Sequence, residues 1–151
     1  MSAIKTEFLF TLFLEFDMQV LGEVPLGIRR IARHTAGRFA GPKLNGTVLP
    51  GGGAWTMLRR DRVWELEVRI TLETDDQQHI YMHWHGLRHG PAEVMERLDR
   101  GEDVDPASYY FRTTPYFETS SQKYDWMNRI CAVGTGSRKA SARTLDIFQL
   151  L

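Results

Sequence analysis

Hydrophobic residues occupy every second position in two long segments of the chain. In the first segment these positions are Phe8, Phe10, Leu12, Leu14 and Phe16. In the second segment they are Trp64, Leu66, Val68, Ile70 and Leu72. Polar residues fill most of the positions between them, and a period of two is typical of a β-strand rather than a helix. We therefore predict strands that include 8–16 and 63–74.

Turn-forming residues divide the remaining chain into further short elements. They cluster at Gly22, Pro25 to Gly27, Gly41-Pro42, Asn45-Gly46 and Pro50 to Gly53. Aromatic and β-branched residues predict three more strands over 109–119, 124–134 and 142–150. One short helix is predicted near 91–100, where a proline suits the first turn and a glycine follows the last.

A hairpin turn is predicted at 75–78, between the second long strand and another alternating segment at 79–88. The number of loop residues decides which side chains meet across this hairpin. An even loop places Arg69 across from Trp84 on the same face, and this is the register that we predict. An odd loop or a bulge would reverse the faces.

These elements predict a single all-β domain over 1–151. We expect a closed or nearly closed antiparallel barrel of about eight strands, because closure removes the unpaired edges of an open sheet. A barrel of this size is wide enough either to be filled by side chains or to hold one small ligand. Its interior is therefore the expected place for a functional site.

Composition excludes several classes of partner. The chain has 19 basic and 19 acidic residues, so nothing indicates the basic surface that binds nucleic acid. Acidic residues flank the apolar stretch 8–14 and no cleavage site follows it, so we expect neither a signal peptide nor a membrane partner. The single cysteine, Cys131, lies in an apolar run where we expect it to be buried, and a cytoplasmic location fits an unpaired thiol.

Five spaced motifs resemble one known family. They are GEVPLG at 22–27, GRFAGP at 37–42 with LNG at 44–46, PGGGAW at 50–55, YFR at 110–112 with FET at 117–119, and YDWMN at 124–128. In this combination nearly the whole chain resembles the family called domain of unknown function 3237. The resemblance implies a small β-barrel similar to the allene oxide cyclase and dirigent barrels, with no established activity. It also implies an acidic residue just before the tryptophan of the glycine-rich motif, where this chain has Ala54.

Charged residues within the predicted strands are the candidates for catalysis. Glu67 and Arg69 lie two positions apart on one strand, and Arg112 lies on another. Arginine can hold a carboxylate or enolate oxygen, and a buried glutamate can transfer a proton. The alternative is that Glu67 and Arg69 are solvated charges on the outer face, because alternation shows which residues share a face but not which face is inside.

Aromatic and polar residues are the candidates for ligand binding. They are Trp55, Trp84, Tyr110, Tyr124, Trp126 and Asn128. A period of two places Tyr110 beside Arg112, and Tyr124 beside Trp126 and Asn128. Aromatic walls with a few fixed donors are typical of a small-molecule pocket. Large aromatic residues in strands are also common in packed cores, which is the alternative.

The sequence predicts neither a metal nor a cofactor. His83 and His85 point the same way on one strand, but no histidine follows His89 to supply a ligand from a distant strand. With an even loop, these two histidines also lie on the opposite face from Glu67. The glycines at 51–53 lead into a predicted strand rather than a helix, so they do not form a phosphate-binding loop.

These observations favour a protein that binds a small anionic or aromatic organic molecule in the barrel interior. The alternative is a cofactor-free isomerase, cyclase or lyase, in which Glu67 or a histidine moves a proton and Arg69 or Arg112 stabilises an oxyanion. Long strands with exposed apolar positions also predict a homo-oligomer.

Overall fold

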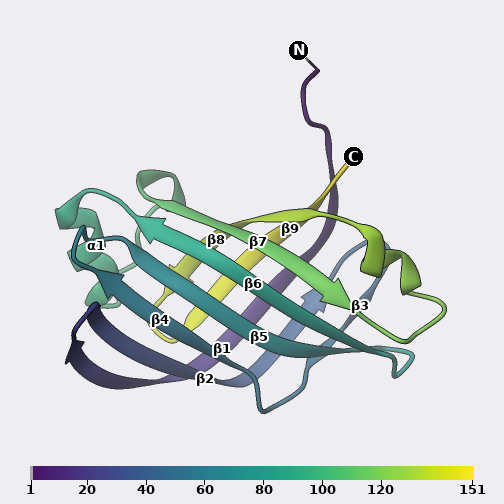
Figure 1. Cartoon of the computed structure of the whole chain (residues 1–151), viewed down its shortest axis with the longest axis horizontal. Helices are drawn as coiled ribbons and strands as arrows, with labels where there is room; N and C mark the ends of the chain where they lie inside the picture. Colours follow the sequence, from purple (N-terminus) through teal and green to yellow (C-terminus); the bar gives the residue numbers. More distant parts are fainter. Residues whose placement is uncertain (1) are drawn as a thin grey trace.

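The computed structural model describes residues 2–151, which form one antiparallel sheet of nine strands (Figure 1). The strands are β1 (Thr6–Val24), β2 (Gly27–Ala40), β3 (Asn45–Val48), β4 (Gly53–Arg59), β5 (Trp64–Thr74), β6 (His79–His89), β7 (Tyr110–Glu118), β8 (Ala132–Lys139) and β9 (Ala142–Leu150). The helical elements are α1 (Ala92–Asp99) and two short 3₁₀ helices, η1 (Pro106–Ser108) and η2 (Asp125–Arg129). In the described part of the chain, no helix has the length and apolar character needed to cross a membrane.

The sheet closes on itself because β1 pairs with both β2 and β9. Hydrogen bonds run in a ring through β1, β9, β8, β7, β6, β5, β4 and β2. The short strand β3 pairs with β2 and β5 beyond the end of β4. The predicted all-β, barrel-like architecture with one short helix is thereby confirmed.

The two alternating segments form strands with one face inside the barrel. Along β5, buried positions alternate with more exposed ones from Trp64 to Thr74. On β1, a register shift between Phe8 and Phe10 buries Leu9 as well and leaves Phe8 37% exposed. An extra residue at a bulge moves the neighbouring side chains to the other face, so the predicted alternation holds only from Phe10 onward.

The hairpin between β5 and β6 differs from the predicted register. Arg69 lies across from His83. A backbone hydrogen bond joins Thr74 to Gln78, which leaves an odd loop whose last residue, Gln77, has φ 62°. Loop length fixes hairpin register. The predicted even loop was therefore wrong, and the tryptophan expected opposite Arg69 lies on the other face of the sheet.

The segment predicted as a strand over 124–134 is a 3₁₀ helix followed by the start of β8. An ion pair at 3.0 Å joins Arg129 to Asp125 one turn away, which suits a helical turn and not an extended strand. Cys131 is exposed just before β8. The prediction that it is buried was wrong, because the alternation of β8 buries its neighbour Ala132 instead.

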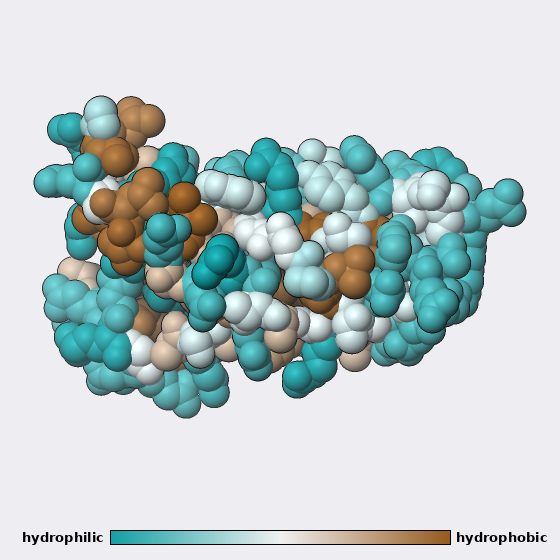
Figure 2. Space-filling view, turned by 90° about the horizontal axis from the view of Figure 1, so that it is seen from below, coloured by the Kyte–Doolittle hydropathy of each residue, from teal (hydrophilic) through white to brown (hydrophobic). Residues whose placement is uncertain are grey.

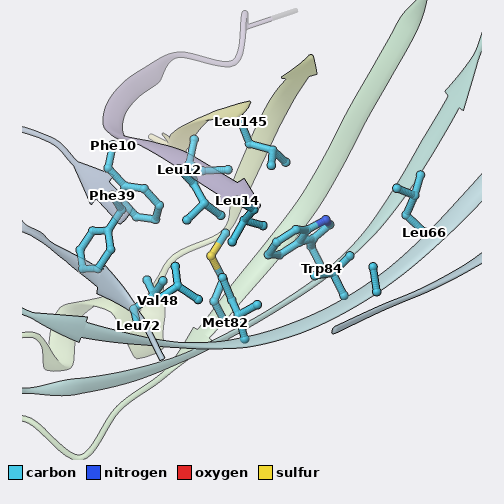
Figure 3. Packing of buried hydrophobic residues seen from close by; sticks show 14 of the residues in the cluster. Phe10, Leu12, Leu14, Phe39, Val48, Leu66, Leu72, Met82, Trp84 and Leu145 are labelled. Atoms are coloured by element: carbon cyan, nitrogen blue, oxygen red, sulfur yellow. The ribbon is translucent and has the colours of Figure 1, made fainter. Parts of the chain in front are cut away.

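Apolar side chains from most of the strands pack together in the barrel interior (Figure 3). Phe10 packs edge-to-face against Phe39, with ring centroids 5.5 Å apart, and against Phe117 at 6.1 Å. Trp84 lies between this group and Leu66 in Figure 3. The helix α1 lies at the opposite end of the barrel, next to the end of β6 (Figure 1).

An apolar patch lies on the surface at the tip of the β1–β2 hairpin. Leu26 is 73% exposed, and Val20 and Leu21 are also more than half exposed. Figure 2 shows hydrophobic side chains gathered at this end of the molecule. Apolar patches of this kind occur at protein interfaces, and the expected self-association stays a prediction.

A substitution on β3 tests the packing of this short strand against β5. A Cβ atom at Gly46 would lie 2.0 Å from the backbone oxygen of Glu73. Gly46→Ala is therefore expected to lower the free energy of unfolding by about 1–3 kcal/mol, because the two backbones must separate. Urea unfolding measures the change. Thr47→Ala, at an exposed position of the same strand, is the control, and equal losses in both variants would contradict the close approach.

Candidate functional site

The three predicted catalytic residues lie on the outer face of the barrel. Glu67 and Arg69 alternate along β5 with the fully buried Leu66 and Val68. Arg112 is likewise exposed on β7, between buried neighbours. The apolar alternates fill the interior, so the charged residues of the same strands face water. The structure does not bring these three residues together inside the barrel, where we expected them.

Glu67 belongs instead to a hydrogen-bonded row on the outer surface. Nε2 of His83 lies 3.0 Å from the Glu67 carboxylate, and Nδ1 of His83 lies 2.6 Å from the Tyr116 hydroxyl. Nε2 of His85 is 3.9 Å from the same carboxylate. The odd loop places these groups on one face, whereas we predicted that Glu67 and the histidines lie apart. Within residues 2–151, no three histidine, cysteine or acidic side chains are arranged to hold a metal ion.

Two of the predicted ligand-binding residues also lie outside. Trp55 is 39% exposed and Tyr110 is 43% exposed. The guanidinium group of Arg69 lies 5.6 Å from the Trp55 ring centroid, and that of Arg112 lies 5.3 Å from the Tyr110 ring. Such cation–π contacts at exposed sites contribute about 0.5–1 kcal/mol, so they organise the surface without forming a pocket.

The predicted residues near η2 hold that helix in place. The Tyr124 hydroxyl donates to the Asp76 carboxylate at 2.9 Å. The Asn128 side chain accepts a hydrogen bond from the backbone N–H of Thr119 at 2.8 Å and donates to its carbonyl oxygen at 2.9 Å. Trp126 is partly buried against the core. These contacts give the three residues an evident structural role.

Three buried arginines converge at the α1 end of the interior. Arg88 on β6, Arg138 on β8 and Arg143 on β9 are 3%, 8% and 2% exposed. Arg138 and Arg143 lie directly opposite each other in the sheet. None of the buried residues in the described chain is an aspartate or a glutamate. This end of the barrel therefore carries a concentration of positive charge inside.

Aromatic rings form the walls around these guanidinium groups. That of Arg88 lies 5.7 Å from the Trp64 ring centroid and 5.5 Å from that of Phe111. That of Arg143 lies 4.3 Å from the ring centroid of Phe16. Cation–π attraction offsets part of the cost of burying a charge. It supplies no hydrogen-bond acceptor in the ring plane of the guanidinium, however.

Several N–H groups of these arginines have no partner among residues 2–151. They are Nε and Nη1 of Arg88, Nε and Nη1 of Arg143, and Nε of Arg138. Burial, followed by repulsion from Arg138 and Arg143, holds the pKa of Arg88 well below its usual range. Burial and Arg138 likewise lower the pKa of Arg143 to about 9. In both cases burial and repulsion between the arginines outweigh the stabilisation that nearby acids give to the charged form.

Asp99, the last residue of α1, is the acid that faces this group. Its Oδ1 lies 3.4 Å from Nη1 of Arg138 and 3.3 Å from Nη1 of Arg30. A cavity of about 100 Å³ lies between α1 and the ends of β4 and β5, lined by Trp64, Met95 and Asp99 among others. The cavity and the arginines therefore share the Trp64 ring and the Asp99 carboxylate.

Deeper in the interior, further polar atoms lack partners within the described residues. They are the indole Nε1 of Trp84, both ring nitrogens of His34, and Oγ1 of Thr113. Burial, followed by the nearby Arg143, lowers the pKa of His34 from 6.5 to about 4. His34 is therefore neutral at pH 7 and can both donate and accept a hydrogen bond. Trp84 is the one predicted ligand-binding residue among these unpartnered groups.

Sequence analysis missed the buried arginines, although a signal was present. Arg88 continues the alternation of Trp84 and Gly86 along the same strand, and Arg143 begins the alternation of Leu145 and Ile147. Continuing the apolar period through a charged residue identifies each as inward-facing. We placed the charged residues Glu67, Arg69 and Arg112 in the interior instead and so passed over these positions.

Comparison with known proteins places the chain in a family. The family model described as protein of unknown function (DUF3237) matches residues 4–150. The chain belongs to this family. A UPF0311 protein of Rhodopseudomonas palustris is 37% identical over 149 residues, which cover 98% of this chain and 97% of the relative.

Solved structures of DUF3237 relatives share the fold. A crystal structure of a conserved protein of unknown function from R. palustris has a TM-score of 0.96 at 36% identity and covers 100% of both chains. A β-barrel-like protein from Acinetobacter baumannii has a TM-score of 0.86 at 38% identity, covering 99% of this chain and 98% of its own. The predicted resemblance is thus confirmed, and it brings a fold without an established activity.

Ala54 points into the barrel interior, as the buried arginines do. It is fully buried and lies across from Ala32 on β2 and Val68 on β5. The family resemblance implies an acidic residue at this position. An acid there would add a negative charge to the interior of the barrel, and Ala54 leaves the buried cations of this chain without it.

The buried imidazole of His34 predicts a pH dependence of stability. Its folded-state pKa of about 4 lies below the unfolded value of 6.5, so the unfolded chain binds more protons between these values. Stability is therefore lost as the pH falls from about 6.5 to about 4, by about 3 kcal/mol from this group. Urea unfolding at several pH values measures the slope. His34→Gln is expected to flatten the slope of stability against pH. His85→Gln, which removes an exposed histidine, is the control and should keep the slope of the natural chain. An unchanged slope in His34→Gln would contradict the assignment.

Removing one buried guanidinium is expected to stabilise the free protein. Arg88→Met keeps the apolar contacts with Trp64 and Phe111 and removes an uncompensated charge, so the free energy of unfolding should rise by about 1–3 kcal/mol. Thermal and urea unfolding at low salt measure the change. Arg112→Met, which removes the same charge from the outer face, is expected to shift stability by less than about 0.5 kcal/mol. A loss of stability in Arg88→Met would mean that the protein itself satisfies this guanidinium.

Proposed function

We propose that this protein binds a small organic anion inside the barrel, at the end covered by α1. The observation that carries the proposal is the pair of fully enclosed guanidinium groups, Arg88 and Arg143, whose Nε and Nη1 atoms lack hydrogen-bond acceptors within the described chain. A carboxylate or a similar anion supplies both the acceptors and the missing charge.

The physical argument rests on the cost of burial. An isolated buried ion costs several kcal/mol even after relaxation, and each unsatisfied buried donor costs about 1–3 kcal/mol. The single facing acid, Asp99, is shared between Arg30 and Arg138. Its carboxylate cannot neutralise four guanidinium groups, so a bound anion would lower the free energy of the folded state more than it would at a neutral site.

The surroundings restrict the size and character of the ligand. Packed aromatic and aliphatic side chains fill much of the interior, and the cavity beside α1 has a volume of about 100 Å³. Trp64, Phe111 and Phe16 lie against the guanidinium groups. An anion with a short, flat apolar body, such as an aromatic carboxylate, complements both the charge and these rings.

Binding without chemical change is favoured over isomerase, cyclase or lyase chemistry. Acid–base catalysis needs a titrating group beside the bound molecule. Glu67 lies on the outer face, and its side chain is 43% exposed. His34 is the histidine closest to the arginines in the interior, and a pKa of about 4 makes it a weak base. The buried residues near α1 therefore favour a binding role.

Benzoate is a suitable probe for this binding site. We expect isothermal titration calorimetry at low salt to detect benzoate binding by the natural chain and none for benzyl alcohol, which has the same ring without the charge. Arg88→Met and Arg143→Met are each expected to weaken benzoate binding at least tenfold, because each removes a donor and a positive charge. Arg112→Met is the matched control on the outer face. Equal weakening in Arg112→Met, or unchanged binding in both interior variants, would overturn the proposal.

A further inference from the structure

The helix α1 lies at the end of the barrel where the buried arginines gather, and its last residue contacts two cations there. We propose that α1 is a lid held shut by the Asp99 carboxylate, and that an entering anion displaces this carboxylate from Arg30 and Arg138. This inference rests on the proposed anion binding. It adds that the Asp99 carboxylate competes with the ligand for the arginines.

Asp99 occupies a position that helix formation alone does not favour. It is the last residue of α1, where the partial negative charge of the helix dipole repels a carboxylate. The distances of 3.3 Å to Arg30 and 3.4 Å to Arg138 account for its placement. Asp99 also counteracts the lowering of the Arg88 pKa by burial, so its charge reaches the buried group.

Little else fastens α1 to the barrel. Of its eight residues only Leu98 is buried, and the helix begins at Pro91 without a side-chain cap. Gly90 precedes it, and Gly101 follows with φ +78°, a conformation that glycine adopts freely. A helix of this length is marginal by itself. Breaking the Asp99 contacts would therefore leave Leu98 and the partly buried Val94 and Met95 as its main attachment.

The chemistry of the exchange is symmetrical. A ligand carboxylate offers the same two oxygens as the Asp99 carboxylate, so a ligand held by Arg88 and Arg143 that also reaches the neighbouring Arg138 competes with Asp99 for it. The Asp99 side chain is 39% exposed, so on release its charge can be solvated by water at modest cost. The buried Arg138, with a side chain 8% exposed, gains an acceptor from the ligand in its place.

Removing the charge of Asp99, which we call the latch, tests whether this carboxylate holds α1 shut. Asp99→Asn keeps the shape of the side chain and removes its charge, and we expect it to bind benzoate at least fivefold more tightly than the natural chain. Glu93→Gln is the control, because it removes an equal charge from the same helix at an exposed residue that does not line the cavity. It is expected to change benzoate binding less than twofold. Circular dichroism and thermal unfolding check that both variants fold.

Amide hydrogen exchange provides a second readout. In Asp99→Asn the amides of 92–99 should exchange at least tenfold faster than in the natural chain, with β5 and β6 unchanged. Saturating benzoate should also accelerate exchange in 92–99 of the natural chain, opposite to the protection that a ligand under a fixed lid would give.

The outcomes separate the two proposals. If neither the natural chain nor Asp99→Asn binds benzoate, the proposed anion binding fails and the latch fails with it. If the natural chain binds benzoate through Arg88 and Arg143 but Asp99→Asn and Glu93→Gln bind with equal affinity, the anion site stands and the displacement of Asp99 is overturned. Protection of 92–99 by benzoate would likewise overturn the displacement of Asp99.

Discussion

The structure depends on the closure of one sheet by pairing β1 with both β9 and β2. Closure turns the alternation of every strand into a division between inside and outside, because each second side chain then points into an enclosed volume. A charged residue in an inward position cannot reach water by a small adjustment of the strand. The placement of Arg88, Arg138 and Arg143 follows from this constraint, as does the exposure of Glu67 and Arg69.

The buried arginines lie at one end of an interior that is mostly apolar. The packing around Phe10, Phe39 and Phe117 is that of a protein core and supplies the apolar burial that folding requires. The burial of the guanidinium groups near α1 lowers the stability that this apolar packing supplies. Such a cost is common where function demands groups that do not favour folding. The apolar packing gives the barrel a rigid base, and the buried arginines concentrate positive charge at one end of it.

The helix α1 lies between the buried arginines and the solvent. The helix contributes one acid, Asp99, to a group of cations that belong to β2, β8 and their neighbours. A segment with little buried area and an electrostatic anchor is the part of a fold that opens at lowest free energy. The outer row of Glu67, His83 and Tyr116 lies on rigid strands in contact with water, where hydrogen bonds of this kind stabilise the surface only modestly.

The fold class could be predicted from the sequence, because period-two alternation and turn residues are local signals. The sequence located the short helix and most strands, and its motifs carried the family resemblance. It could not fix the β5–β6 register, since one loop residue, Gln77 with φ 62°, reverses every facing pair. It also took Tyr124 to Asn128 for a strand, because their anchors Asp76 and Thr119 are distant in sequence or lie across a loop. Which face of each strand lies inside follows from the way the strands assemble in three dimensions. The same assembly buries three arginines that come from three separate strands. These arginines come together only because the sheet closes into a ring. Closure depends on pairing between strands that are distant in sequence, so no local pattern predicts it.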